Sequence, residues 1–149
     1  MVYNIPRYSG VIINADNLGE IKKSCRVEGI KYTDSNLYEL ERIRTRYTEM
    51  TVMFGQDESF LYSLPVGVNG AIGSNLQLHA EKFKRIWNAY HEGRQEEAEK
   101  IQHEACRIID ALLQVRDITA VKYLLGRKGI VCGDCRSPFS PITEAQKQY

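Results

Sequence analysis

The chain has 149 residues, of which 43% are hydrophobic and 26% are charged, and its net charge at neutral pH is +1. This length allows one domain with a buried core, and this composition excludes a disordered or fibrous protein. The near-neutral charge gives no broad electrostatic reason to expect binding to nucleic acid or to an anionic membrane. The chain lacks an apolar run of the roughly 18 residues that a membrane span needs, and its first residues lack the pattern of a signal peptide. We therefore expect a cytoplasmic protein.

Segments of strand and helix character alternate along the first half of the chain. The predicted strands are residues 1–5, 27–33, 51–55 and 70–74. The predicted helices between them are residues 14–24, 34–47 and 57–67. Asn14 or Asp16 can cap the first of these helices, and Asp34 or Ser35 the second. The second helix is amphipathic, because three apolar residues fall three apart on one face: Leu37, Leu40 and Ile43.

The spacing of the strands predicts an α/β fold with a parallel sheet. Strand starts recur roughly every 19 to 26 residues, which suits βα units. A parallel sheet of four strands has two edges that need cover. The natural completion is eight strands closed into a (β/α)₈ barrel. We expect one domain over 1–149, with four βα units in 1–91 and a helical extension in 92–149.

The helical extension contains a long amphipathic helix over residues 96–115. Its apolar seam consists of Ala98, Ile101, Ala105, Ile108, Leu112 and Val115. These positions alternate three and four apart, which predicts one continuous buried stripe. Packing within the chain is favoured over an oligomer interface. A shorter helix at about 117–127 precedes a tail that contains glycine and proline.

Four cysteines occur in the chain, and two of them form the tetrapeptide CGDC. In a cytoplasmic protein, Cys25, Cys106, Cys132 and Cys135 are expected to be free thiols. Zinc sites usually need a second cysteine pair or nearby histidines, and neither follows Cys135. An incidental pair is therefore favoured over a metal or redox role, and no metal site is predicted.

Polar residues gather where the predicted strands end. In the segment EGIKYTDSN, Lys31 stands in what we expect to be a buried strand. Burying a lysine is costly unless it is paired or neutral, and a neutral amine attacks carbonyl groups. The other candidates near strand ends are Tyr3, Thr33, Gly55, Asp57, Glu58 and Ser74. Because reactive groups of (β/α)₈ barrels gather at this end of the strands, imine chemistry on a polyhydroxylated carbonyl compound is one interpretation.

Each candidate also has a structural interpretation that the residues alone leave open. Lys31 could reach solvent from the strand end, and Tyr3 could be a core tyrosine with a bonded hydroxyl. Asp57 and Glu58 could favour the start of the next helix. Gly55 could be a turn or packing glycine.

Five segments together resemble the N-acetylneuraminate lyase and dihydrodipicolinate synthase family of pyruvate-dependent class I aldolases. They are YNIPRYSG, GIKYTDSNLYELERI, FGQDE, GVNGAIGS and CRSPFSP. The resemblance covers essentially the whole chain, and the Asp-Glu pair after the third strand is most similar to the N-acetylneuraminate lyase branch. It implies a partial (β/α)₈ barrel, equivalent to strands five to eight, followed by C-terminal helices. It also implies a homo-oligomer, because full-length family members are usually tetramers.

The resemblance assigns roles to single residues. Lys31 matches the Schiff-base lysine and Tyr3 the tyrosine that moves a proton to and from the substrate. The residues that match sugar-binding positions are Thr33, Gly55, Asp57, Glu58 and Ser74. The implied reaction cleaves N-acetylneuraminate to pyruvate and N-acetylmannosamine. No cofactor is expected, because the lysine supplies the electrophile.

Three departures from the family pattern keep alternatives open. Residues 75–77 are Asn-Leu-Gln, where lyases of this branch commonly have Thr-Tyr-Asn. Dihydrodipicolinate synthases carry an arginine where Tyr8 stands. The family's hydroxyl pair that binds the pyruvate carboxylate and a tyrosine from a neighbouring subunit have no match here. The alternatives are an aldolase for another 2-keto-3-deoxy sugar acid, a dihydrodipicolinate synthase-like enzyme, or an inactive half barrel with exposed strand edges.

Overall fold

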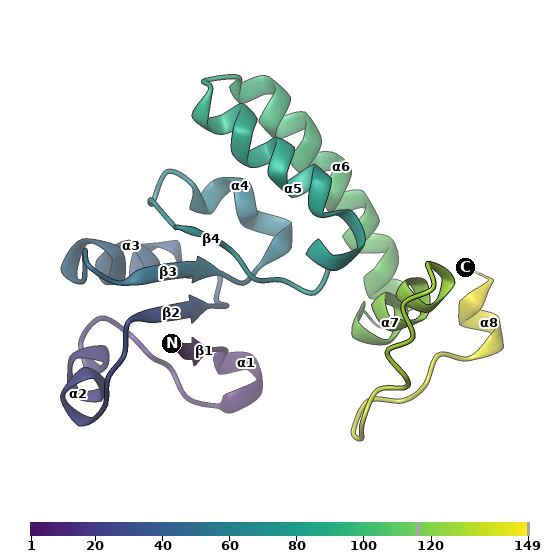
Figure 1. Ribbon diagram of the computed structural model, residues 1–149, viewed down its shortest axis with the longest axis horizontal. Helices are drawn as coiled ribbons and strands as arrows, with labels where there is room; N and C mark the ends of the chain where they lie inside the picture. The colour runs from purple at the N-terminus through teal and green to yellow at the C-terminus, as the bar shows by residue number, and fades with distance from the viewer. Residues whose placement is uncertain (116, 149) are drawn as a thin grey trace. The chain divides into compact units, whose positions relative to one another are not determined.

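The computed structural model describes residues 1–115 and 117–148 (Figure 1). Contacts divide the chain into two compact units, Met1–Gly73 and Ser74–Tyr149, which we describe in turn. The predicted division at residue 91 falls inside the second unit, between α5 (Leu76–His91) and α6 (Gln95–Gln114). That division stays a prediction.

The first unit is built on a four-stranded parallel sheet (Figure 1). Its strands lie in the order of the chain: β1 (Val2–Asn4), β2 (Gly29–Tyr32), β3 (Thr51–Phe54) and β4 (Gly70–Ala71). The connections contain α1 (Pro6–Ser9), α2 (Asn17–Ser24), α3 (Leu37–Arg46), η1 (Asp57–Ser59) and α4 (Phe60–Ser63). All four predicted strands are confirmed, and β1 and β4 are the sheet edges. The fourth is shorter than predicted, because only two of its residues pair.

The two faces of this sheet differ in burial. Residues that alternate on one face are fully buried: Ile30, Tyr32, Val52 and Phe54. The other face carries Tyr3, Lys31 and Met53, which lie side by side in register and are exposed or half-buried. Parallel sheets are usually covered on both faces. This sheet has a covered face and an open face, and the candidate lysine lies on the open one.

Helix caps in the first unit differ in part from the prediction. Of the two predicted caps of α2, Asp16 is the N-cap but makes no capping bond with its side chain, whereas the Asn14 side chain accepts hydrogen bonds from the N–H groups of Asp16 and Asn17. The predicted caps of α3 are wrong, because the cap is Asn36, whose side chain accepts from the Glu39 N–H. A short helix, α1, was not predicted. It begins at Pro6, whose fixed φ suits the first helical position.

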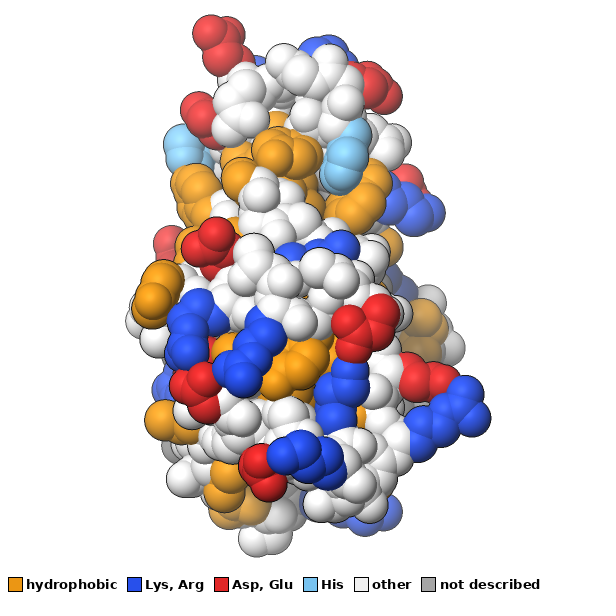
Figure 2. All heavy atoms as spheres, turned by 90° about the vertical axis from the view of Figure 1, so that its left-hand side faces the viewer, with side chains coloured by type: hydrophobic (Ala, Val, Ile, Leu, Met, Phe, Trp, Pro, Cys, Tyr) orange, Lys and Arg blue, Asp and Glu red, His pale blue; other side chains and the backbone are white. Residues whose placement is uncertain are grey.

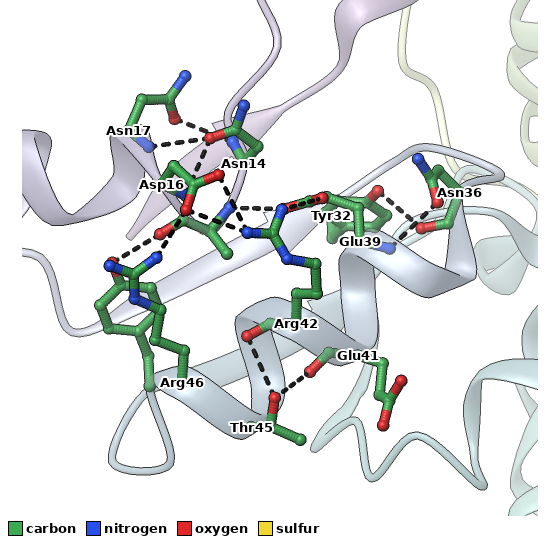
Figure 3. A network of polar contacts seen from close by, with 12 residues as sticks. Asn14, Asp16, Asn17, Tyr32, Asn36, Glu39, Glu41, Arg42, Thr45 and Arg46 are labelled. Carbon is green, nitrogen blue, oxygen red and sulfur yellow. Dashed lines mark hydrogen bonds and ion pairs between the residues drawn. The ribbon is translucent and has the colours of Figure 1, made fainter.

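A polar network joins the start of α2 to α3 (Figure 3). The Asp16 carboxylate accepts hydrogen bonds from Arg42 at 3.0 Å and from Arg46 at 2.7 Å. Arg42 also donates to Glu39, whose second oxygen accepts from the Ala15 N–H at 2.6 Å. The two arginines lower the pKa of the Asp16 carboxyl. The network fixes the loop that follows β1 against the next βα unit.

The second unit is a group of helices: α5, α6, α7 (Asp117–Arg127) and α8 (Glu144–Lys147). Five residues of the predicted seam on α6 are buried: Ala98, Ile101, Ala105, Leu112 and Val115. The sixth residue, Ile108, is half-buried and packs against the buried cluster at the end of α6, and its neighbour Ile109, which was not predicted, is buried. The step of four from Ala105 to Ile109 keeps the seam on one helical stripe.

Packing of this seam is internal to the chain, as the sequence favoured. The end of α6 joins a cluster of buried residues that also contains Leu78 of α5 and Val121 and Leu125 of α7. The seam therefore faces neighbouring helices of the same unit.

Charges are mixed on the face of the protein that Figure 2 shows. Lysine and arginine side chains alternate there with aspartate and glutamate, with hydrophobic side chains between them. Among the helices of residues 1–115 and 117–148, none is long and apolar enough to cross a membrane.

Candidate functional site

Lys31 and Tyr3 are neighbours on the open face of the sheet. They are register partners on β2 and β1, and Lys31 Nζ lies 4.0 Å from the centroid of the Tyr3 ring. An ammonium or iminium group over an aromatic face at this distance is attracted by the ring. The structure therefore places the two predicted reactive side chains in contact.

The expectation that Lys31 lies in a buried strand is wrong in one respect. The neighbours of Lys31 along β2 are buried, whereas Lys31 itself is half-buried. Its register partners, Tyr3 and Met53, are exposed and half-buried, so this face of the sheet is accessible to solvent. Alternation along the strand explains the difference, because successive side chains point to opposite faces.

Thr33 and Gly55 lie beside Lys31, and we call these three residues the Lys31 corner. A Cβ atom added at Gly55 would lie 1.9 Å from Thr33 Oγ1 and 3.2 Å from Lys31 Cε. The first contact is closer than real Cβ contacts ever are, and the second is tighter than most of them, so a side chain at position 55 would displace Thr33 and crowd Lys31. Thr33 Oγ1 is buried and has no hydrogen-bond partner among the described residues. A hydroxyl in that state can donate to, or accept from, a polar ligand.

Asp57 and Glu58 follow β3 but differ in burial. Asp57, the first residue of η1, is 3% exposed, whereas Glu58 is exposed. The Asp57 carboxylate occupies the space beside Gly73, where an added Cβ atom would lie 1.5 Å from Asp57 Oδ1. The structure thus brings Asp57 to the end of the segment that follows β4. Both carboxylates stand in the first turn of η1, where the sequence analysis allowed them to favour the start of a helix.

Ser74 is the first residue of the second unit and is half-buried. Its carbonyl oxygen accepts a hydrogen bond from the Gln77 side chain at 3.4 Å. It follows Gly73 directly in the chain. Its predicted contact with substrate stays a prediction.

Two residues of this region had no role in the sequence analysis. Asn4, after Tyr3, is 1% exposed, and its side-chain oxygen accepts from the Ile13 N–H at 2.9 Å. Its Nδ2 is buried without a partner among the described residues. Gly73 admits the Asp57 carboxylate. Both stand in quoted motifs, YNIP and AIGS, but a close approach between backbone and side chain from another loop leaves no mark in spacing or hydropathy.

Tyr32 lies on the covered face of the sheet, where burial changes the pKa of its hydroxyl. Burial raises the pKa of the Tyr32 hydroxyl, with smaller contributions from Asp34 and Glu39. That hydroxyl donates to the Asn36 carbonyl oxygen at 2.9 Å. Tyr32 therefore holds the end of β2, next to Lys31 and Thr33, against the start of α3.

Residues that could hold a metal ion were sought among His, Cys, Asp and Glu. In the part of the chain that the structure describes, no group of three or more of them is close enough together. The four cysteines are free thiols, and Cys132 and Cys135 belong to the second unit.

Comparison with protein families gives a match along the whole chain. The model of the dihydrodipicolinate synthetase family matches residues 1–149.

Solved structures of similar fold include N-acetylneuraminate lyases. The chain is 30% identical to the Clostridium difficile protein CdNal, solved with mannosamine, with a TM-score of 0.90. It is 31% identical to N-acetylneuraminate lyase from Fusobacterium nucleatum complexed with pyruvate, with a TM-score of 0.87. Each match covers 99% of this chain and 51% of the other. Dihydrodipicolinate synthase DapA-2 from Bacillus anthracis, at 24% identity and a TM-score of 0.87, shares the fold over 98% of this chain and 50% of its own.

The chain therefore spans about half the length of the solved structures that it matches. The predicted fold class, a partial (β/α)₈ barrel followed by C-terminal helices, is confirmed by the parallel sheet together with these similarities.

Proposed function

This chain belongs to the dihydrodipicolinate synthetase family, and we propose that it carries the Schiff-base part of an aldolase of the N-acetylneuraminate lyase type. The observation that carries the proposal is the contact between Lys31 and Tyr3, with Lys31 Nζ 4.0 Å from the ring centroid. The similarity to the lyase from Fusobacterium nucleatum, solved with pyruvate, supports the choice of branch.

Lys31 acts as the nucleophile in this proposal. Its neutral amine attacks the C2 ketone of open-chain N-acetylneuraminate, water leaves, and a protonated imine forms. The imine withdraws electrons, so the C3–C4 bond breaks in a retro-aldol step. N-Acetylmannosamine leaves, and the remaining enamine is protonated and hydrolysed to pyruvate and free Lys31. The Tyr3 ring beneath Nζ favours the cationic imine, as it favours any cation at that distance.

Tyr3 also supplies the proton transfer. Its hydroxyl group is carried by the ring that Lys31 contacts. The Tyr3 side chain is 48% exposed on the open face of the sheet, so a substrate can reach it. In the cleavage direction it accepts the proton of the C4 hydroxyl and returns it at a later step. General acid–base catalysis of this kind contributes about 10²- to 10⁴-fold to the rate.

The sugar chain is held by Thr33, Gly55, Asp57, Glu58 and Ser74 in this proposal. The Thr33 hydroxyl lacks a partner among the described residues, so a substrate hydroxyl would satisfy it. Carboxylates such as Glu58 accept hydrogen bonds from sugar hydroxyls, and a site built for such bonds rejects substrates that cannot make them. Substrate is thus a sugar acid and product is pyruvate. We further propose a cytoplasmic homo-oligomer, as in the family resemblance.

Pyruvate release from two sugar acids tests this function. The purified chain is incubated with N-acetylneuraminate or 2-keto-3-deoxygluconate, beside Lys31→Ala, Tyr3→Phe and the control Lys23→Ala. Lys23 is exposed on α2 and ion-paired with Glu20. We expect release from N-acetylneuraminate, loss in Lys31→Ala, no change in Lys23→Ala, and a drop in kcat of about 10² or more in Tyr3→Phe.

Each other outcome has a defined meaning. Release that persists in Lys31→Ala contradicts the Schiff-base role. Preference for 2-keto-3-deoxygluconate overturns the choice of substrate but keeps the mechanism. Absence of release with both compounds assigns the chain to the inactive half barrel that the sequence left open.

A further inference from the structure

A cavity of about 290 Å³ lies in the second unit, between α7, the loop after it, and α8. The wall from α7 includes Thr119, Lys122 and Arg127, and α8 contributes Lys147. Both cysteines of the CGDC segment line the same cavity. The proposed aldolase chemistry uses none of these residues, so the cavity is a candidate for a separate function.

The loop that carries the two cysteines is fixed to α7 by polar contacts. Lys122 Nζ donates to the carbonyl oxygens of Cys132 at 3.2 Å and Asp134 at 3.0 Å. The Thr119 hydroxyl lies 3.1 Å from the Ser140 carbonyl oxygen and 3.6 Å from Cys135 Sγ. The cysteine pair therefore sits in a loop that is bonded to α7.

The two thiols differ in exposure. Cys132 is exposed, and Cys135 is half-buried, with its sulfur beside the Thr119 hydroxyl. Gly133 between them has a φ of +65°, a left-handed conformation that permits the chain to turn within the tetrapeptide. An outer thiol for attack and an inner thiol close in sequence is the arrangement that a two-cysteine exchange reaction needs.

Basic residues outnumber acidic residues in the lining of the cavity. Three basic residues line the cavity, Lys122, Arg127 and Lys147, against one acidic residue, Asp134. Arg127 and Lys147 both approach the Tyr123 side chain, which holds them at the wall. Reactive cysteines occur in partly exposed sites with basic residues nearby, and such sites attract anionic reagents.

We propose that Cys132 and Cys135 form a redox-active dithiol that reacts with a small disulfide bearing carboxylate groups. The Cys132 thiolate attacks one sulfur of the disulfide, forms a mixed disulfide, and releases one small thiolate. The Cys135 thiolate then attacks Cys132 Sγ, forms the Cys132–Cys135 disulfide, and releases the second small thiolate. Two protein thiols are oxidised, one small disulfide is reduced to two thiols, and the two thiol protons pass to the released thiolates.

Oxidised glutathione is the probe for the first test. The reduced full-length chain is treated with it, quenched by alkylation at intervals, and mapped by peptide mass spectrometry. Cys25 is the internal control, because it is exposed and lies in the first unit. We expect a Cys132–Cys135 disulfide to form about tenfold or more faster than any adduct at Cys25, since an electropositive site accelerates anionic reagents by at least that factor. In Cys135→Ser, the glutathione adduct should persist at Cys132.

Charge selectivity is the second test. The rate at Cys132 with oxidised glutathione is divided by the rate with cystamine, a cationic disulfide. Arg127→Gln should lower this ratio several-fold, while Lys100→Gln, which removes an exposed charge on α6, should leave it unchanged. Equal rates at Cys132 and Cys25 in the wild-type chain overturn the proposal, as does a mixed disulfide that Cys135 never resolves. Neither result depends on aldolase activity.

Discussion

Replacing Gly55 by alanine perturbs the Lys31 corner. The added Cβ atom would lie 1.9 Å from Thr33 Oγ1, 2.9 Å from Thr33 Cβ and 3.2 Å from Lys31 Cε. Separations below about 3.0 Å are essentially never observed for Cβ atoms, so Thr33 must move. We therefore expect Gly55→Ala to displace Thr33 and to crowd the Lys31 side chain.

The expected loss of stability follows from these distances. Overpacking a tight site costs about 1–3 kcal/mol. Alanine recovers about 0.4–1 kcal/mol by restricting the unfolded chain. We therefore expect Gly55→Ala to lower the free energy of unfolding by about 1–2 kcal/mol.

A double-mutant cycle with Thr33→Ala identifies the cause. Thr33 Oγ1 has no hydrogen-bond partner among the described residues, so its removal alone should change stability by less than about 0.5 kcal/mol. In the Gly55→Ala background, removing Oγ1 should recover about 1 kcal/mol. Recovery is partial, because the 2.9 Å contact with Thr33 Cβ remains.

Urea unfolding followed by circular dichroism measures each variant, with Gly126→Ala as the matched control. Gly126 lies in α7 with nothing within 4 Å of an added Cβ atom, so that substitution should be neutral or stabilising by up to about 1 kcal/mol. A Gly55→Ala chain as stable as wild type, or a cycle without coupling to Thr33, would refute the proposed packing of the Lys31 corner.

Three further predictions concern packing and charge. Ile109→Ala should lower the free energy of unfolding, measured in urea, by about 2–4 kcal/mol, and Ile108→Ala should lower it clearly less. Equal losses would contradict the deeper burial of Ile109. Tyr32→Phe should cost about 0.5–1.5 kcal/mol through the lost bond to the Asn36 carbonyl, whereas an unchanged midpoint would argue against that bond. Burial, then two nearby lysines, lower the pKa of His79. The stabilisation from neutral His79 should therefore be fully present above a pH of about 6.5 and be lost as the pH falls below it. His79→Gln should make the free energy of unfolding depend less on pH in that range.

Much of the fold follows from patterns that act locally. Apolar segments located all four strands, and their regular spacing indicated a parallel sheet. The predicted seam on α6 omitted only Ile109, because Ile108 and Ile109 are adjacent and a three-or-four step fits either. The cap of α3 was misplaced because Asp34, Ser35 and Asn36 are all good capping residues in succession.

Less of the candidate site than of the fold could be predicted from the sequence. Lys31 and Tyr3 could be paired from strand ends and family motifs, and the register bears out that they are neighbours. Alternation along β2 puts Lys31 on the face opposite to its buried neighbours, but how far that face is covered depends on the rest of the fold. The approach of the Asp57 carboxylate to Gly73 joins residues on different loops, so it emerges only in three dimensions.

Reductive trapping tests the central claim most directly. The chain is incubated with pyruvate and borohydride, its intact mass is read, and any adduct is mapped to a residue. We predict one pyruvate-derived adduct at Lys31, and its absence in Lys31→Arg. A wild-type chain that gains no adduct under conditions that label a full-length N-acetylneuraminate lyase, or gains it at another lysine, would contradict the assignment of Lys31 as the Schiff-base residue of this chain.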